Sequence, residues 1–251
     1  GAYDAGKLSL EDLKNIENVA CPNAGSCGGM FTANTMASIS EALGIALPGS
    51  ASPPAEDDRR EKIVYETGKA CTELLELNIK PRDILTFESF ENAITMLNAV
   101  GGSTNGILHL LALANEVKIK LTYDDFERIR KKTPHIADMK PGGGYVMNSL
   151  DKIGGIPLVM KKLLDNNLIH GNTLTVTGKT IEENIKQFKI STTEQQIVRE
   201  VENPLHGVGT AVILKGTLAP EGAVIKTAGV EMTKFTGKAR VFDGEESAFD
   251  S

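Results

Sequence analysis

The sequence predicts a chain of two parts, a helix-rich part over residues 1–195 and a strand-rich part over residues 196–251. Up to about residue 190, apolar residues recur at helical spacing in long segments. From Pro204 onward the apolar runs become short and are punctuated by glycines, which is typical of strands. A length of 251 residues with 41% hydrophobic residues is ordinary for a globular protein and long enough for two domains.

The first helices are predicted from their caps and from their apolar spacing. Ser9 precedes two acidic residues and starts a helix that runs through Ile16. A largely buried helix is expected over 30–43, and Gly44 is its C-terminal stop. After a proline-rich loop, a charged helix begins near Glu56 and continues through residue 75, with Cys71 on its apolar side and therefore in the core.

The rest of the chain alternates glycine-rich turns with helical and then strand-like segments. Further helices are expected over 84–100, 106–115, 122–132, 153–164 and 179–188, and a last one starts near 245. A loop dense in turn-forming residues spans 134–147, with Asp138 and Lys140 embedded in it. Strand-like runs are expected at 174–177, 209–216, 222–226 and 238–242.

Composition excludes several classes of function. A net charge of -6 without clustered Lys and Arg argues against a nucleic-acid surface. No apolar run approaches the roughly 20 residues that a membrane-spanning helix needs, and no signal pattern opens the chain, so a cytoplasmic location is expected. The cysteines at 21, 27 and 71 form no disulfide framework, which suits a reducing compartment.

Cys27 is the first candidate for chemistry. It lies in the glycine-rich turn Ala24–Met30, directly before a helix whose free N–H groups and positive dipole end favour the thiolate form. Thiolate is the form that binds soft metals, so the turn suggests a metal ligand. The plain alternative is a small buried cysteine in a tight turn, and for an isolated cysteine that alternative would be preferred.

The second candidate is the turn Gly101-Gly-Ser-Thr-Asn105, which enters a very apolar helix. Backbone N–H groups and hydroxyls there could bind a carboxylate or phosphate through Ser103, Thr104 and Asn105. The alternative is an ordinary N-cap made by a hydroxyl. His109, inside the following helix, is interpreted as a packed histidine. The polar residues of the helix over 30–43 either satisfy one another or face a ligand site.

Several stretches resemble the dihydroxy-acid and 6-phosphogluconate dehydratase family, in family order along nearly the whole chain. They are Gly25–Met36, Glu41–Gly44, Leu47–Ala51, Gly101–Asn105, Met139–Gly143, Leu174–Thr180 and Leu218–Lys226. The nearer branch of the family is the one that acts on dihydroxy acids. The resemblance implies an α/β fold: the later part of a large α/β N-terminal domain, followed by the start of a β-barrel-like C-terminal domain.

The resemblance also implies a function. Members of this family are hydro-lyases that convert 2,3-dihydroxy carboxylic acids to 2-oxo acids in valine and isoleucine biosynthesis, and act as homodimers. They hold an iron-sulfur cluster (2Fe-2S or 4Fe-4S) through three cysteines, with Mg²⁺ beside it. Cys27 matches the third cysteine, whereas Cys21 matches no ligand position. The open iron acts as a Lewis acid on the departing hydroxyl, and magnesium holds the carboxylate end.

Other family positions have no counterpart in this sequence. The first two cluster cysteines and two magnesium ligands belong upstream of Gly1, and a magnesium-binding glutamate and the serine base belong downstream of Ser251. By this comparison no catalytic residue lies within the chain, and an internal fragment of a longer protein is expected. Two alternatives stay open: a dehydratase of 6-phosphogluconate or an aldonate, and an inactive remnant that keeps the fold without the chemistry.

Overall fold

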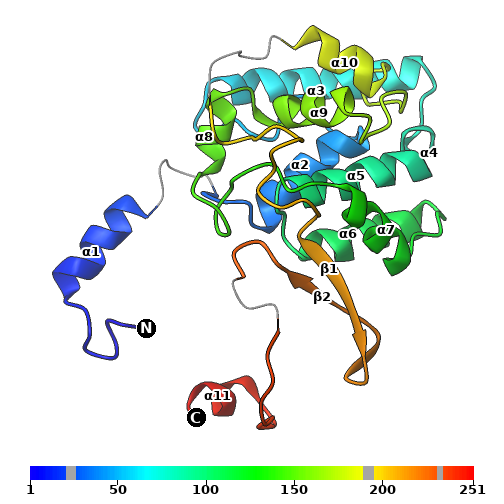
Figure 1. Ribbon diagram of the computed structural model, residues 1–251. Helices are drawn as coiled ribbons and strands as arrows, with labels where there is room; N and C mark the ends of the chain where they lie inside the picture. The colour runs from blue at the N-terminus through cyan, green and yellow to red at the C-terminus, as the bar shows by residue number, and fades with distance from the viewer. Residues whose placement is uncertain (21–26, 189–194, 231–233) are drawn as a thin grey trace.

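The computed structural model describes residues 1–20, 27–188, 195–230 and 234–251 (Figure 1). Within them, helices and one two-stranded antiparallel sheet follow one another along the chain. The helices are α1 Leu10–Val19, α2 Thr32–Leu43, α3 Arg59–Glu76, α4 Pro81–Ile84, α5 Phe87–Ala99, α6 Asn105–Glu116, α7 Tyr123–Lys132, α8 Met147–Lys152, α9 Gly155–Asp165, α10 Ile181–Gln187 and α11 Glu245–Phe249. The strands are β1 Ala211–Gly216 and β2 Ala219–Lys226.

Helix α5 is the centre of the helical body, and α2 packs beside it (Figure 1). Nearly every residue of α5 from Ser89 to Ala99 is buried. One apolar cluster joins α2 and α5 to α6 and α7, and the other joins them to α8 and α9. The polar residues inside α5 are satisfied: Asn92 donates to the carbonyl of His170 at 2.9 Å, and Asn98 donates to that of Ile94 at 2.9 Å.

Helix α1 begins as predicted but stands apart from the body. Ser9 and Asp12 form a reciprocal capping box that satisfies free N–H groups at the start of the helix. No residue of α1 is buried, and Leu10, Ile16 and Val19 are exposed. Figure 1 shows α1 separated from the other helices.

Two predicted core residues are in fact exposed. Cys71 was expected in the core, but α3 covers the body from outside and buries only Ala70, so the thiol of Cys71 is exposed. His109 was expected to be packed, yet it lies on the solvent side of α6, whose buried face is formed by Gly106, Ile107, Leu110 and Ala114. In both helices, apolar side chains extend beyond the face that packs against the helical body.

The strand predictions are correct for the hairpin and wrong elsewhere. Strands β1 and β2 pair antiparallel, with Ala211 opposite Lys226. The start of β1 is fixed to the body, because the Ala211 amide donates to the side-chain oxygen of Asn98 at 3.1 Å. The run 238–242 forms no strand, and 174–177 contributes only an isolated bridge between Leu174 and Thr180. Both runs lack a neighbouring strand with which to build a ladder among the described residues.

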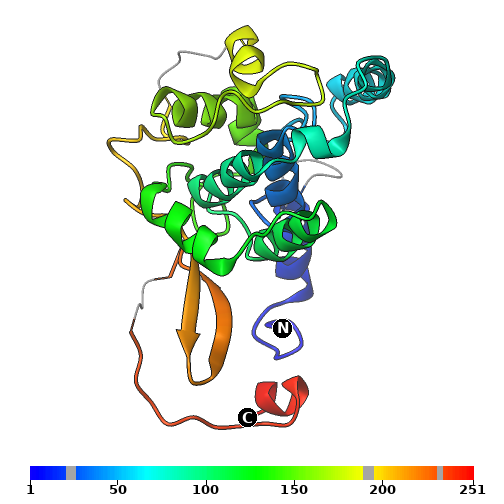
Figure 2. The ribbon, with the colours of Figure 1, turned by 90° about the vertical axis from the view of Figure 1, so that its right-hand side faces the viewer.

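The architecture agrees with an α/β N-terminal domain followed by the start of a C-terminal domain. The hairpin projects from one end of the helical body (Figure 2). A barrel is not formed by this pair of strands. Among the described residues, no helix has the length and apolar character needed to cross a membrane.

Candidate functional site

The turn that carries Cys27 is held in place by Asn34 on the first turns of α2. The side-chain amide of Asn34 donates to the carbonyl oxygens of Cys27 at 2.8 Å and Gly29 at 2.7 Å. The thiol itself is exposed, and its nearest polar contact is the Gly29 carbonyl at 3.8 Å. Cys27 is thus presented to solvent at the N-terminal end of α2. Cys21 lies outside the described residues.

The same turn is docked onto the loop over 134–147. The amide of Met30 donates to the Lys140 carbonyl at 2.6 Å, and the amide of Met147 donates to the Gly28 carbonyl at 2.8 Å. A Cβ atom at Gly29 would lie 2.7 Å from the Lys140 carbonyl oxygen, so only glycine fits at that position. Glycine at position 29 therefore has a concrete cause, which is close contact with this loop.

The second predicted turn meets the first at the N-terminal ends of α2 and α6. Thr32 lies at the centre of this meeting: its hydroxyl accepts from the Asn105 side-chain amide at 2.7 Å and lies 3.2 Å from the Ser103 hydroxyl. The Ser103 amide donates to the Thr35 hydroxyl at 2.9 Å. We call Thr32, Asn34, Thr35, Ser103 and Asn105 the polar corner. It brings the predicted residues Ser103 and Asn105 next to the helix that follows Cys27.

Thr104 differs from its two neighbours. It stands at the N-cap of α6 in a helical conformation, and its side chain makes no capping hydrogen bond. The Ser103 hydroxyl instead accepts from the Asn105 amide at 3.3 Å. The alternative interpretation of this turn as an ordinary N-cap is therefore partly correct, because Ser103 accepts a backbone N–H at the start of α6. Its hydroxyl and the side chain of Asn105 also belong to the contact between the two helices.

Asp138 shapes the loop that covers the cysteine turn. Its carboxylate accepts from the Gly144 amide at 3.0 Å, and its own amide donates to the Ile197 carbonyl at 2.8 Å. The Lys140 amide donates to the Tyr145 carbonyl at 2.7 Å, which closes the loop on itself. The loop is therefore an ordered platform under the turn of Cys27.

Glu41 is a buried carboxylate whose role the sequence analysis did not identify. It is 3% exposed and accepts backbone N–H groups from Gly49 and Ala51, each at 2.8 Å. Burial raises its pKa to about 7, against the lowering effect of these backbone donors. Glu41 thus fixes the loop after α2. The spacing from Glu41 to the Pro-Gly-Ser turn was the available signal, but it does not reveal which N–H groups the side chain reaches.

His135 and His206 form a second pair that sequence reasoning missed. Their ring planes are nearly parallel, at 7°, with centroids 5.2 Å apart and Nδ1 atoms 2.9 Å apart, so the two rings meet edge to edge. His135 is buried, and burial followed by the nearby charge of His206 lowers its pKa to about 4. The residues are separated by 71 positions in the sequence, so no local pattern could have paired them.

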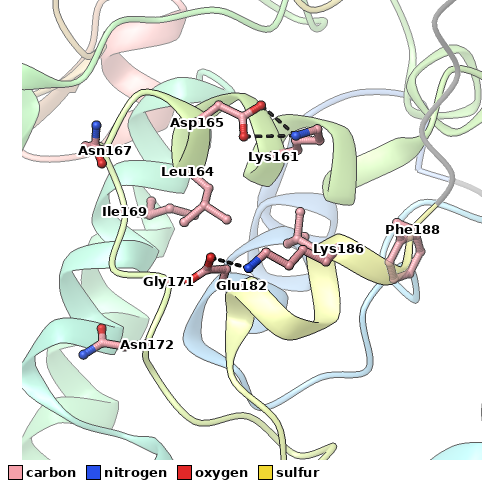
Figure 3. Close-up of a pocket in the computed structure, with 11 residues that line it drawn as sticks. Lys161, Leu164, Asp165, Asn167, Ile169, Gly171, Asn172, Glu182, Lys186 and Phe188 are labelled. Carbon is pink, nitrogen blue, oxygen red and sulfur yellow. Dashed lines mark hydrogen bonds and ion pairs between the residues drawn. The ribbon is translucent and has the colours of Figure 1, made fainter.

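An open hollow of about 630 Å³ lies elsewhere, between α9 and α10 (Figure 3). Its walls carry two ion pairs, Lys161 with Asp165 and Lys186 with Glu182. None of the predicted site residues lines it. Because its charged groups neutralise one another locally, we do not assign it to the predicted chemistry.

Cys27 has properties that suit a soft-metal ligand: its thiol is exposed and flanked by glycine, and its contact among the described residues is the weak one to the Gly29 carbonyl. Within the described ranges, no group of three or more His, Cys, Asp or Glu side chains could hold a metal ion. Cys27 is the thiol of the predicted site in the part of the chain that the structure describes, and no complete metal site is formed there.

Comparison with known proteins agrees with the motifs. The family model for the N-terminal part of dihydroxy-acid/6-phosphogluconate dehydratases matches residues 1–184, and the model for their C-terminal part matches residues 196–251. Proteins named dihydroxy-acid dehydratase are similar over 250 residues: 59% identical from Sulfolobus acidocaldarius, 56% from Sulfurisphaera tokodaii and 59% from Saccharolobus solfataricus. Each match covers 99% of this chain but 45% of the relative, so the chain spans about half the length of these relatives.

Proposed function

The chain belongs to the dihydroxy-acid/6-phosphogluconate dehydratase family, and we propose that it forms part of a hydro-lyase that converts 2,3-dihydroxy carboxylic acids to 2-oxo acids. The observation that carries this proposal is the 59% identity, along 99% of the chain, to a protein named dihydroxy-acid dehydratase. Substrates of this class would place the whole protein in branched-chain amino-acid biosynthesis.

Cys27 is proposed as one thiolate ligand of an iron-sulfur cluster. The family implies metal cofactors, and an iron-sulfur cluster with Mg²⁺ would supply Lewis-acid activation of the hydroxyl that leaves. The exposed thiol lies beside glycines, which leave a bulky group access to it. The docked loop over 134–147 fixes the backbone of the turn beside Cys27.

The polar corner is proposed as a wall of the substrate pocket. Ser103 and Asn105 offer a hydroxyl and an amide, which match the hydroxyl and carboxylate groups of a dihydroxy acid. Thr32 orients both side chains at distances of 3.2 and 2.7 Å. Thr104, next to them on the same turn, belongs to the same proposed wall.

The whole protein is further proposed to be a cytoplasmic homodimer. The exposed thiols of Cys27 and Cys71 suit a reducing compartment, since an oxidising one would pair or modify them. The proposed dimer rests on the family resemblance. Analytical ultracentrifugation of the full-length protein measures the assembly directly.

The test uses the full-length protein that contains this chain, reconstituted anaerobically with iron and sulfide. We expect it to release a 2-oxo acid from a short branched 2,3-dihydroxy acid and not from 6-phosphogluconate. Cys27→Ser should lose visible cluster absorption and activity together, whereas Cys71→Ser, an equally exposed thiol on α3, should keep both. Turnover of 6-phosphogluconate alone would assign the sugar-acid branch, and full activity in Cys27→Ser would refute the ligand assignment.

A polypeptide limited to these 251 residues should neither bind a stable cluster nor dehydrate substrate, because it offers one described cluster ligand. Visible absorption after anaerobic reconstitution checks this. A stoichiometric cluster that resists chelators would contradict it.

A further inference from the structure

We propose that His135 is a positioning residue that holds the Gly101–Asn105 turn in place and couples it to the segment around His206. The inference rests on the proposed function, because it concerns the turn that carries Ser103 and Asn105. His135 touches neither side chain. It acts through the backbone of Gly101, directly before them.

The contact with Gly101 is close and specific. His135 is 3% exposed, and a Cβ atom at Gly101 would lie 2.6 Å from its Nε2 atom. Gly101 also has a φ of +60°, a conformation that favours glycine. The amides of Ile136 and Ala137, which follow His135, both donate to the Ala99 carbonyl at 3.0 Å. The imidazole and its flanking backbone therefore fix both the position and the bend of the turn.

The other face of His135 is bound to a segment distant in sequence. The His135 amide donates to the His206 carbonyl at 2.9 Å, and the Leu205 amide donates to the His135 carbonyl at 2.9 Å. The two rings are nearly parallel, at 7°, with Nδ1 atoms 2.9 Å apart. An N–H···N hydrogen bond requires one Nδ1 to carry a proton and the other to accept it. The pair therefore breaks if both Nδ1 atoms are protonated.

Few other side-chain hydrogen bonds join His135 to the segment 199–210. Among the described residues, the buried side-chain nitrogen and oxygen atoms without a partner are His135 Nε2, Arg199 Nε and Thr210 Oγ1. His135 and the segment 199–210 supply all of them. Backbone hydrogen bonds also join the two segments, from Arg199 to Ile136 and between His135 and residues 205 and 206, and the Nδ1 contact is the side-chain hydrogen bond that joins them. Loss of either ring should therefore loosen the Gly101–Asn105 turn while these backbone bonds keep the two segments together.

The charged groups near His135 are Lys226 on β2 and Asp138 in the loop, in addition to His206. Lys226 lies opposite Ala211, so the hairpin contributes a positive charge to the surroundings of the pair. A change in the hairpin thus reaches the substrate turn through the same imidazole. His135 is thus one route by which residues after 196 can influence the turn before α6, beside the contact of Asn98 with Ala211.

The experiment compares variants of the reconstituted full-length enzyme. His135→Phe keeps a ring against Gly101 but removes the Nδ1 contact, and His135→Asn keeps a polar group near Nδ1 but removes the ring contact. We expect either change, and His206→Ala, to raise KM by about tenfold with kcat within about twofold. The control is His109→Ala, an exposed histidine of α6 that should leave both constants unchanged.

A double-mutant cycle tests the contact itself. Gly101→Ala should be severely impaired, and Gly101→Ala combined with His135→Ala should be less impaired than the product of the single effects, because removal of the ring makes room for the new methyl group. Multiplicative effects, or an equal fall of kcat in every variant, would overturn the proposal.

Amide hydrogen exchange supplies a readout that does not need turnover. In His206→Ala, exchange should accelerate in peptides covering 99–107 and stay unchanged in α3 and α9. If the wild type fails to dehydrate any dihydroxy acid while this local change is seen, the proposed function fails and the coupling stands. Uniform acceleration across the protein would reduce His135 to a general structural residue.

Discussion

The side-chain amide of Asn105, at the first position of α6, donates a 2.7 Å hydrogen bond to the hydroxyl of Thr32, at the first position of α2. The two helix starts are thereby joined, one after the cysteine turn and the other after the Gly-Gly-Ser-Thr-Asn turn. Two motifs separated by more than seventy residues thus form one surface.

Thr32→Val should separate these two helix starts. Valine keeps the shape of threonine but removes the oxygen that accepts from Asn105 and contacts Ser103. We expect a loss of about 0.5–1 kcal/mol in the free energy of unfolding, because the hydrogen bond is lost while the exposed Asn105 amide can still bind water, together with a higher KM in the full-length enzyme. Thr67→Val is the control, since its exposed hydroxyl bonds only to its own helix, at the Ile63 carbonyl. Urea titration of both variants compares them.

Gly29→Ala should detach the cysteine turn from its platform. The added methyl group would lie 2.7 Å from the Lys140 carbonyl oxygen, so the backbone contact between the turn and the loop must open. We expect destabilisation by about 1–3 kcal/mol and faster alkylation of Cys27. Gly68→Ala offers the opposite case: it lies in the exposed part of α3 with open space around it and should stabilise the protein by about 0.5–1 kcal/mol. Equal effects of the two substitutions would contradict the steric argument.

The pH dependence of stability should contain two opposing contributions. The pKa of Glu41 is raised from 4.5 to about 7. Its contribution to the free energy of unfolding is therefore complete below pH 4.5 and is lost as the pH rises to 7. The pKa of His135 is lowered from 6.5 to about 4, so its contribution is complete above pH 6.5 and is lost as the pH falls to 4. Each amounts to about 3 kcal/mol at most, and they nearly cancel between pH 4.5 and 6.5.

Single variants should reveal the two slopes. In Glu41→Gln, stability relative to wild type should rise with pH across this window, because only the histidine term remains. In His135→Phe the relative stability should fall with rising pH. Chemical denaturation at closely spaced pH values measures both, and parallel curves for the wild type and both variants would show that neither group titrates with folding.

Asn98→Ala should loosen the hairpin more than the helical body. The Asn98 side chain accepts from the Ala211 amide at 3.1 Å, and both groups are buried. Truncation leaves that N–H without a partner, at a cost of about 1–3 kcal/mol. Amide exchange should therefore accelerate first in 211–226, and Asn166→Ala, which removes a bond within the end of α9, should not affect the hairpin. Unchanged exchange in the hairpin would show that other contacts hold it.

Much of the helical order followed from local signals. Ser9, Thr86 and Thr180 cap their helices through reciprocal bonds with the third residue, and Gly44 ends α2 in a left-handed conformation. These features depend on residues within one helical turn, so the sequence displays them. Cys71 and His109 failed because exposure depends on which helix lies opposite, and apolar spacing does not show that.

The separate parts of the candidate site could be predicted from the sequence, but the way they are arranged in space could not. The sequence identified the turn of Cys27 and the turn of Ser103 by their glycines and polar side chains. It could not show that Thr32 joins them or that Lys140 receives the amide of Met30. Glu41 and the histidine pair were missed for the same reason, since their function depends on partners that only the fold brings near.

The hairpin of β1 and β2 has a consequence for handling the protein. Each strand has an outer edge that no other strand covers among the described residues. Leu214 and Ile225 are exposed on the strands, and Leu218 is exposed in the turn between them. Unpaired edges with exposed apolar side chains are templates for pairing with another molecule. A polypeptide limited to these residues should therefore self-associate as its concentration rises. Light scattering should grow with concentration and diminish when a lysine replaces Leu218.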